Sequence, residues 1–188
     1  MPTWQPTTTQ PILTKRIPTP PFGDWDDRHI VGYDEYVKTG GYQGLRKAIT
    51  MKPEDVTEEV KKSQLRGRGG AGFPCGLKWT FLPKIEDGKK PGEPGAERYL
   101  AINADESEPG TFKDRLLMDF DPHIMLEGIA ICCYACRLDK AYVYIRGEYY
   151  HQAMMVENAI KHAYENGIFG EGGLLNGMTT ATGEPFKV

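Results

Sequence analysis

The sequence predicts an α/β domain with parallel strands, preceded by an extended arm and helices. Two short segments, Tyr99–Asn103 (YLAIN) and Ala141–Ile145 (AYVYI), have the apolar and aromatic composition of strands, and we expect the first to be buried. A helix beginning at Pro122 separates them, and an amphipathic helix over Tyr149–Asn166 follows. The order strand, helix, strand, helix favours parallel strands joined by helical crossovers.

The segments before the first strand have clear composition signals. Residues 1–23 are rich in Pro and Thr and predict an extended arm, with the domain itself over residues 24–188. A short helical segment is expected around Tyr33–Ile49. Pro53 then begins a helix (PEDVTEEVKKSQ) whose early acids and late lysines suit the helix dipole.

Two further segments complete the chain. Lys84–Glu97 is polar and rich in Pro and Gly, which predicts an insertion between the elements. The chain ends in GEPFKV, which is typical of the opening of another strand. We therefore expect the chain to be truncated at its C-terminus.

Charge and cysteine content exclude several classes of protein. The formal net charge of -3 gives no basic footprint, so we expect no binding to nucleic acid. The longest apolar run, Ile129–Cys136, is too short to span a bilayer. Three of the four cysteines crowd into that run, which is a poor disulfide framework. A reducing compartment is expected, with membrane association only through partners.

A glycine loop over Arg66–Gly76 gives the strongest chemical signal. It holds five glycines within ten residues, which permits close backbone approach to a flat or anionic ligand. Lys78 adds a positive charge, and Phe73, Trp79 and Phe81 offer stacking faces for an aromatic base.

The letters GRGGAG in this loop fit the GxGxxG pattern of dinucleotide-binding folds, but their context differs. That pattern should follow a strand and open a helix, whereas this loop follows the helix from Pro53. A flexible linker is the alternative. It is less favoured because flexible linkers lack the interleaved Arg, Phe and Trp seen here.

An acidic loop, Asn103–Phe112 (NADESEPGTF), directly follows the first strand. Open α/β sheets bind ligands just beyond the carboxyl ends of their strands, so a site is expected here. Asn, Ser and carboxylate groups can bond sugar or ribityl hydroxyls. The alternative is a solvated loop with Pro-Gly turn chemistry. Its position after the strand favours the site.

The cysteines and histidines predict no metal centre. Cys133 and Cys136 form a CxxC within an apolar helical stretch that has no second pair, which favours packing over ligation. Cys75 has no histidine close in sequence to activate it. The histidines His29, His123, His151 and His162 fall in no ligand spacing.

Three runs, LRGRGGAGFPCGLKW, NADESEPGTFKDR and YIRGEY, together resemble the flavoprotein subunit of respiratory complex I and its relatives in NAD-reducing hydrogenases and NAD-dependent formate dehydrogenases. The resemblance covers about residues 30–170. It implies a Rossmann-like FMN-binding domain that takes a hydride from NADH and passes single electrons to iron–sulfur clusters, towards quinone. Such transfer needs face-to-face stacking, and the flavin supplies the hard chemistry.

The resemblance also implies which residues form the site. Phe73 and Phe81 are implied to sandwich the adenine of NADH. Glu106 and Glu108 are implied to lie near the nicotinamide end, as the candidates for a direct part in catalysis. The implied cofactor-binding residues are Gly67, Arg68, Gly69, Gly70, Gly72, Phe73, Lys78, Phe81, Asn103, Asp105, Glu106 and Ser107.

Departures from the family pattern and missing motifs limit this resemblance. Gln64 stands where the family usually has glycine, and Cys75 where threonine is common. A second flavin-binding stretch (Gly-Glu-Glu-Thr) and the C-terminal cysteine motif for an iron–sulfur cluster are missing from the sequence. The chain therefore resembles the N-terminal part of that flavoprotein and supplies no cluster ligands.

The resemblance further implies partners and a location. The partners are NADH and the other subunits of a multisubunit complex, especially a thioredoxin-like iron–sulfur subunit. The location is the cytoplasm or the mitochondrial matrix side, peripheral to the inner membrane. One alternative is the diaphorase subunit of a soluble hydrogenase or formate dehydrogenase. Another is a non-catalytic assembly module that has lost its flavin.

Overall fold

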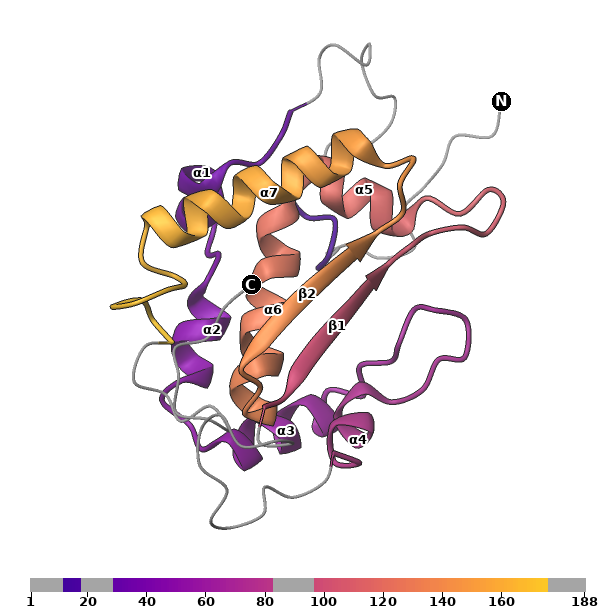
Figure 1. The fold of residues 1–188 in the computed structure, drawn as a ribbon. Coiled ribbons are helices and arrows are strands. Elements are labelled where there is room, and N and C mark those ends of the chain that lie inside the picture. The colour runs from indigo at the N-terminus through magenta and orange to yellow at the C-terminus, as the bar shows by residue number, and fades with distance from the viewer. Residues whose placement is uncertain (1–11, 18–28, 83–96, 176–188) are drawn as a thin grey trace.

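The computed structural model describes residues 12–17, 29–82 and 97–175, and Figure 1 shows their arrangement. The insertion expected over Lys84–Glu97 lies outside the described residues except for Glu97, and so does the expected C-terminal strand. In chain order the elements are α1 (Tyr33–Lys38), α2 (Gln43–Ala48), α3 (Pro53–Lys62), α4 (Cys75–Trp79), β1 (Tyr99–Ala104), α5 (Lys113–Phe120), α6 (Pro122–Cys136), β2 (Lys140–Ile145) and α7 (Tyr150–Glu165).

The two strands are parallel, as predicted. Their register runs from Tyr99 opposite Lys140 to Ala104 opposite Ile145. Helices α5 and α6 form the connection between them, and α7 follows β2. The predicted order of strand, helix, strand and helix is therefore confirmed, and so are the helix starts at Pro53 and Pro122.

Helix α5 was not predicted from the sequence, which indicated no helix between the first strand and Pro122. The segment KDRLLMDF buries Met118, Asp119 and Phe120 at its C-terminal end. Its first turn is stabilised from a distance in sequence, because both carboxylate oxygens of Glu106 accept backbone N–H groups there. A cap eight residues upstream leaves no local signature in the sequence.

The single helical segment expected around Tyr33–Ile49 is also wrong, because it divides into α1 and α2. Gly40 has φ +91° and Tyr42 has φ +58°, so the backbone leaves the right-handed helical region between the two helices. Gly41 lies so close to the Tyr36 ring that a Cβ atom there would overlap it. Close packing of α1 against this turn therefore ends the first helix.

The strands are buried on one face only, which corrects the expectation of a buried first strand. Figure 1 shows helices α6 and α7 on one side of the sheet. On that side Leu100 and Ile102 pack against the main core, and Ala104 is buried. On the opposite face, Tyr142 and Tyr144 of β2 are exposed. Among the described residues, no helix covers this second face.

A buried polar network joins the N-terminal segment to the helices. Arg16 donates to the Asp121 carboxylate at 3.1 Å, and its guanidinium lies 4.3 Å from the centre of the Tyr36 ring. Glu127 accepts the Tyr36 hydroxyl and the backbone N–H of Tyr42. The described part of the predicted arm, residues 12–17, is thus fastened to α1 and to the start of α6. None of the helices in the described ranges is long and apolar enough to cross a bilayer.

Candidate functional site

The glycine loop lies between α3 and α4, with its two ends tied together. The amide of Gly67 donates to the Phe73 carbonyl at 2.9 Å, and the amide of Cys75 donates to the Leu65 carbonyl at 2.8 Å. The Arg66 guanidinium donates to the Gly72 carbonyl at 3.1 Å across the loop. The loop is therefore a closed structure and differs from a flexible linker, whose ends would be free of such bonds.

The tip of this loop presents backbone amides to a ligand. No described residue accepts a hydrogen bond from the amides of residues 68–73. Gly70 has φ +108° and Gly72 has φ +63°, whereas Gly69 and Ala71 have no positive φ, and such alternation is typical of backbone nests that bind anions. Such an arrangement suits an anion or an electron-rich ring edge.

The loop glycines differ from a structural glycine nearby. A Cβ atom at Gly69, Gly70 or Gly72 would meet no described residue within 4 Å, so the part of the chain that the structure describes leaves the space beside the loop open. At Gly76 a Cβ atom would lie 2.6 Å from the backbone nitrogen of Lys61, so that glycine is required for α3 and α4 to pack. The open positions permit a flat ligand to approach the backbone closely.

Two aromatic rings lie at the α4 end of the loop. Phe73 and Phe81 are 43% and 65% exposed, and their ring centres are 5.8 Å apart at an interplanar angle of 53°. A base between parallel rings needs two van der Waals layers, or about 7 Å. The rings therefore contact each other here, and a sandwich requires them to separate. Lys78, on α4, is exposed beside them.

The acidic loop begins at the carboxyl end of β1. The Asn103 side-chain oxygen accepts the amide of Asp105 at 3.0 Å, and the Asp105 carbonyl accepts the amide of Ser107 at 3.1 Å. The side chains of Asn103, Asp105 and Ser107 belong to exposed residues. These three predicted ligands of the flavin thus lie together in one tight turn at the sheet edge.

Glu106 lies in the same loop but faces inward. Its side chain is only 1% exposed, and its carboxylate accepts the amides of Asp114 and Arg115 at 2.9 and 3.0 Å. Burial opposes the charge, but these backbone bonds and the Lys113 ammonium hold the pKa of Glu106 below its usual range. Its carboxylate is therefore ionised and committed to α5, whereas Glu108 is exposed.

Arg146 and Tyr149 contact this loop from the end of β2, and sequence reasoning had assigned neither of them a role. Arg146 donates to the Glu106 carbonyl at 2.9 Å and to both carboxylate oxygens of Glu148, at 3.1 and 2.7 Å. The Tyr149 hydroxyl lies 3.4 Å from the same carbonyl. The signal that could have found them is the position of YIRGEY directly after the second strand, at the edge where ligands bind.

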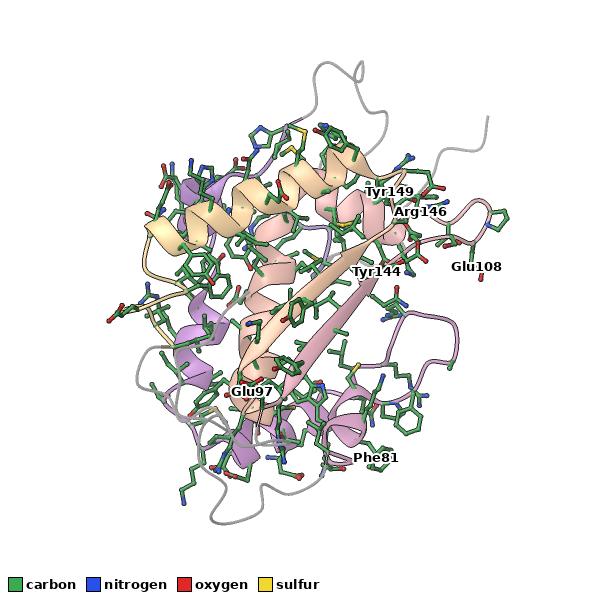
Figure 2. All side chains as sticks on the ribbon, in the orientation of Figure 1. Phe81, Glu97, Glu108, Tyr144, Arg146 and Tyr149 are labelled. Carbon is green, nitrogen blue, oxygen red and sulfur yellow. The ribbon has the colours of Figure 1, made fainter. Side chains whose placement is uncertain are left out.

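The predicted site residues therefore form two groups. Figure 2 shows Glu108, Arg146 and Tyr149 together near the carboxyl ends of the strands, and Phe81 at the α4 end of the molecule. The glycine loop projects on the side of the sheet where β1 lies (Figure 1). An elongated ligand is needed to contact both groups.

The cysteines of α6 do not form part of either group. Cys133 and Cys136 are 2% and 8% exposed, and burial raises the pKa of the Cys133 thiol. Both belong to the core face of α6. Across the ranges that the structure describes, no three His, Cys, Asp or Glu side chains are placed to hold a metal ion.

Most of this chain is similar in sequence to known proteins. Residues 60–183 match the family described as the Nuo51 FMN-binding domain. The chain is 46% identical over 170 residues to the F 2 subunit of the NADH-quinone oxidoreductase of Rhizobium meliloti, covering 90% of this chain and 37% of that protein. It is 46% identical over 171 residues to the F subunit of the corresponding Aquifex aeolicus enzyme, covering 91% and 36%.

A solved structure is similar as well. It is an NAD⁺-reducing [NiFe]-hydrogenase in the H₂-reduced state, with a TM-score of 0.57 and 33% identity, covering 73% of this chain and 23% of that one. The same hydrogenase type in the air-oxidised state gives a TM-score of 0.58. The chain spans about a third of the length of the curated relatives it matches.

Proposed function

This chain belongs to the Nuo51 FMN-binding domain family, and we propose that it holds FMN and receives NADH for hydride transfer to that flavin. The observation that carries the proposal is the glycine loop. Its tip amides have no acceptor among the described residues, and the space beside Gly69, Gly70 and Gly72 is open. A flavin nucleotide combines a flat ring with a phosphate, and both suit such a loop.

The acidic loop supplies the second half of the proposed flavin site. Asn103, Asp105 and Ser107 offer an amide, a carboxylate and a hydroxyl in one turn, which are suitable partners for ribityl hydroxyls. Gly67, Arg68, Gly69, Gly70, Gly72 and Lys78 complete the proposed flavin-binding set. In this arrangement the loops hold the nucleotide by many hydrogen bonds and need no side chain to act as a nucleophile.

NADH is proposed to lie along the line between the two groups of residues. Its adenine enters between Phe73 and Phe81, whose present contact at 5.8 Å must open to receive it. Its nicotinamide lies at the strand end, near Glu106 and Glu108. Of these two acids, the exposed Glu108 is the one that we propose faces the nicotinamide, while Glu106 fixes the loop through α5. When bound, FMN accepts the hydride and releases single electrons.

We further propose that the parent protein delivers these electrons to iron–sulfur clusters and towards quinone. The support is the name that the relatives share, since both are F-type subunits of an NADH-quinone oxidoreductase. On the same basis its partners are the other subunits of such a complex, including a thioredoxin-like iron–sulfur subunit, and its contact with the inner membrane is indirect. A diaphorase subunit is the second candidate, favoured by the similarity to an NAD⁺-reducing hydrogenase.

The test uses the native gene product purified with the subunits that remain attached to it. Flavin released by acid should be FMN, in a ratio close to one per chain. Anaerobic NADH should bleach the flavin absorbance, and reoxidation should proceed with a quinone. A preparation without flavin contradicts the proposal and favours the assembly module. If NADH reduces the flavin but hydrogenase subunits co-purify with the chain, the result favours the diaphorase subunit.

A further inference from the structure

The Arg146 side chain connects the ends of the two parallel strands. Ala104 and Ile145 are register partners, so Asp105 and Arg146 begin the two loops that leave the sheet side by side. From β2 the guanidinium reaches across to the Glu106 carbonyl at 2.9 Å. Strand pairing ends at Ala104 and Ile145, and beyond it the Arg146 side chain adds one hydrogen bond between the two loops.

We propose that Arg146 is a positioning residue for ligand binding, acting through the Glu106 carbonyl to set the orientation of Asp105 and Ser107. This inference rests on the proposed function, in which those two residues bind FMN. The Arg146 side chain contacts neither Asp105 nor Ser107 itself, but it contacts Glu106, which lies between them.

The contacts of Glu106 explain how one arginine can fix the conformation of the acidic loop. Its carboxylate is held by the amides of Asp114 and Arg115, and its carbonyl is held by Arg146. The residue is thereby fixed at both its side chain and its backbone. Since its two neighbours, Asp105 and Ser107, are exposed, fixing Glu106 inward turns them outward together.

The arginine is itself held in a defined geometry. The Glu148 carboxylate accepts hydrogen bonds from Nε and Nη2 of Arg146 in a bidentate pair. Nη1 is thereby left to donate to the Glu106 carbonyl. Its guanidinium lies 5.4 Å from the centre of the Tyr149 ring, and the Tyr149 amide closes the turn by donating to the Arg146 carbonyl at 3.0 Å. A side chain held at three places is suited to orient another group, as supporting residues around ligand sites do.

The arginine is not required for packing in the core. Its side chain is 26% exposed, and its bidentate partner Glu148 is 71% exposed. It lies outside both clusters of buried residues. Loss of its charge should therefore change the loop and leave the stability of the domain close to normal.

The experiment compares three variants of the native gene product with its attached subunits. Arg146→Met removes all donors while keeping an unbranched, flexible side chain. Arg146→Lys restores one charged donor towards the carbonyl. Arg137→Met is the matched control. Arg137 also forms an ion pair with an exposed acid, Glu54, at 2.9 Å, but it follows the last residue of α6 and is distant in sequence from the acidic loop. For each we measure FMN affinity, thermal unfolding, the flavin midpoint potential and hydrogen exchange.

We expect Arg146→Met to weaken FMN binding about tenfold or more, as removal of a charge-assisted hydrogen bond should. The flavin potential should shift, and the unfolding temperature should stay unchanged. Exchange of the Ser107 and Thr111 amides should become faster, while that of the Asp139 amide, at the opposite end of the sheet, should not. Arg146→Lys should recover most of the affinity, and Arg137→Met should behave as the unmodified protein.

Unchanged affinity and loop exchange in Arg146→Met would overturn the inference. A general loss of stability in that variant, with faster exchange at both ends of the sheet and no recovery in Arg146→Lys, would also overturn it. The exchange measurement needs no ligand, so it decides the loop role separately. If the unmodified protein holds no FMN, the proposed function fails, and exchange at Ser107 and Thr111 still decides whether Arg146 orders the loop.

Discussion

The hydroxyl of Tyr42 lies 2.8 Å from Nδ1 of His123, and both side chains are 1% exposed. Burial lowers the pKa of His123 to about 4, with a smaller contribution from the charge of His162. The imidazole is therefore neutral at physiological pH, and it forms a hydrogen bond with the tyrosine hydroxyl. This bond joins the start of α2 to the first turn of α6, in the centre of the core.

We expect this histidine to make the stability of the domain depend on pH. Its pKa in the folded chain, about 4, lies below the ordinary value of 6.5. Its contribution is therefore complete above pH 6.5 and is lost as the pH falls towards 4, in total roughly 3 kcal/mol. The buried Asp121, whose pKa burial raises despite the nearby Arg16, acts in the opposite direction at low pH.

The measurement is chemical denaturation between pH 4 and pH 7, with His123→Gln for comparison. The unmodified chain should lose stability over this range, and the variant should lose less. Parallel curves for the two proteins would assign the pH dependence to other groups.

Substitutions in the glycine loop should affect flavin binding without affecting folding. Gly69→Val should abolish flavin retention without unfolding the chain, because a Cβ atom there meets no described residue within 4 Å and the side chain extends into the space proposed for the ligand. Gly67→Val should do the same. Gly76→Ala is the contrast, since its Cβ would clash with Lys61 and cost about 1–3 kcal/mol. Flavin fluorescence after acid release and circular dichroism give the two readouts. Normal flavin content in both valine variants would refute the assigned role.

The aromatic pair predicts an effect on NADH alone. Base–aromatic stacking contributes roughly 1–3 kcal/mol per base in nucleic-acid complexes. Phe73→Ala or Phe81→Ala should therefore raise the KM for NADH about tenfold, with flavin content unchanged. Tyr150→Ala is a suitable control, because that side chain is 74% exposed at the start of α7. A KM that does not change would leave the two rings with a packing role only.

The cysteines of α6 should prove structural. Replacing Cys133 and Cys136 together by alanine should leave the metal content and the electron paramagnetic resonance signals of the assembled enzyme unchanged. Because both thiols are buried, a loss of stability of about 1 kcal/mol is expected. Disappearance of an iron–sulfur signal would identify them as ligands instead.

Several elements were predictable because their signals are local. Pro53 and Pro122 mark helix starts, and the alternation of strands and helices favours parallel pairing. The break between α1 and α2 also has a local signal, the pair Gly40-Gly41, where the backbone leaves the right-handed helical region. The exposure of one face of β1, in contrast, was not predictable. A short apolar segment does not reveal which of its faces meets a helix.

The candidate site was likewise only partly predictable from the sequence. The sequence indicated which loops gather polar and glycine residues, but not the direction of each side chain. Glu106 and Glu108 are two residues apart, yet one caps α5 and the other is exposed. That difference depends on the amides of Asp114 and Arg115, which come into place only in the folded chain. Likewise, the contact between Phe73 and Phe81 depends on how α4 follows the loop.

The parallel pairing of β1 and β2 also sets an order of events during synthesis. Lys140 follows its partner Tyr99 by 41 residues, so β1 leaves the ribosome well before it can pair. At roughly 5–20 residues per second, the delay is about 2–8 s. During that time Leu100 and Ile102 have only the emerging α6 to pack against. Truncated chains released from the ribosome that end before Lys140 should therefore be cut by protease within YLAIN, whereas released chains that include α7 should be protected there.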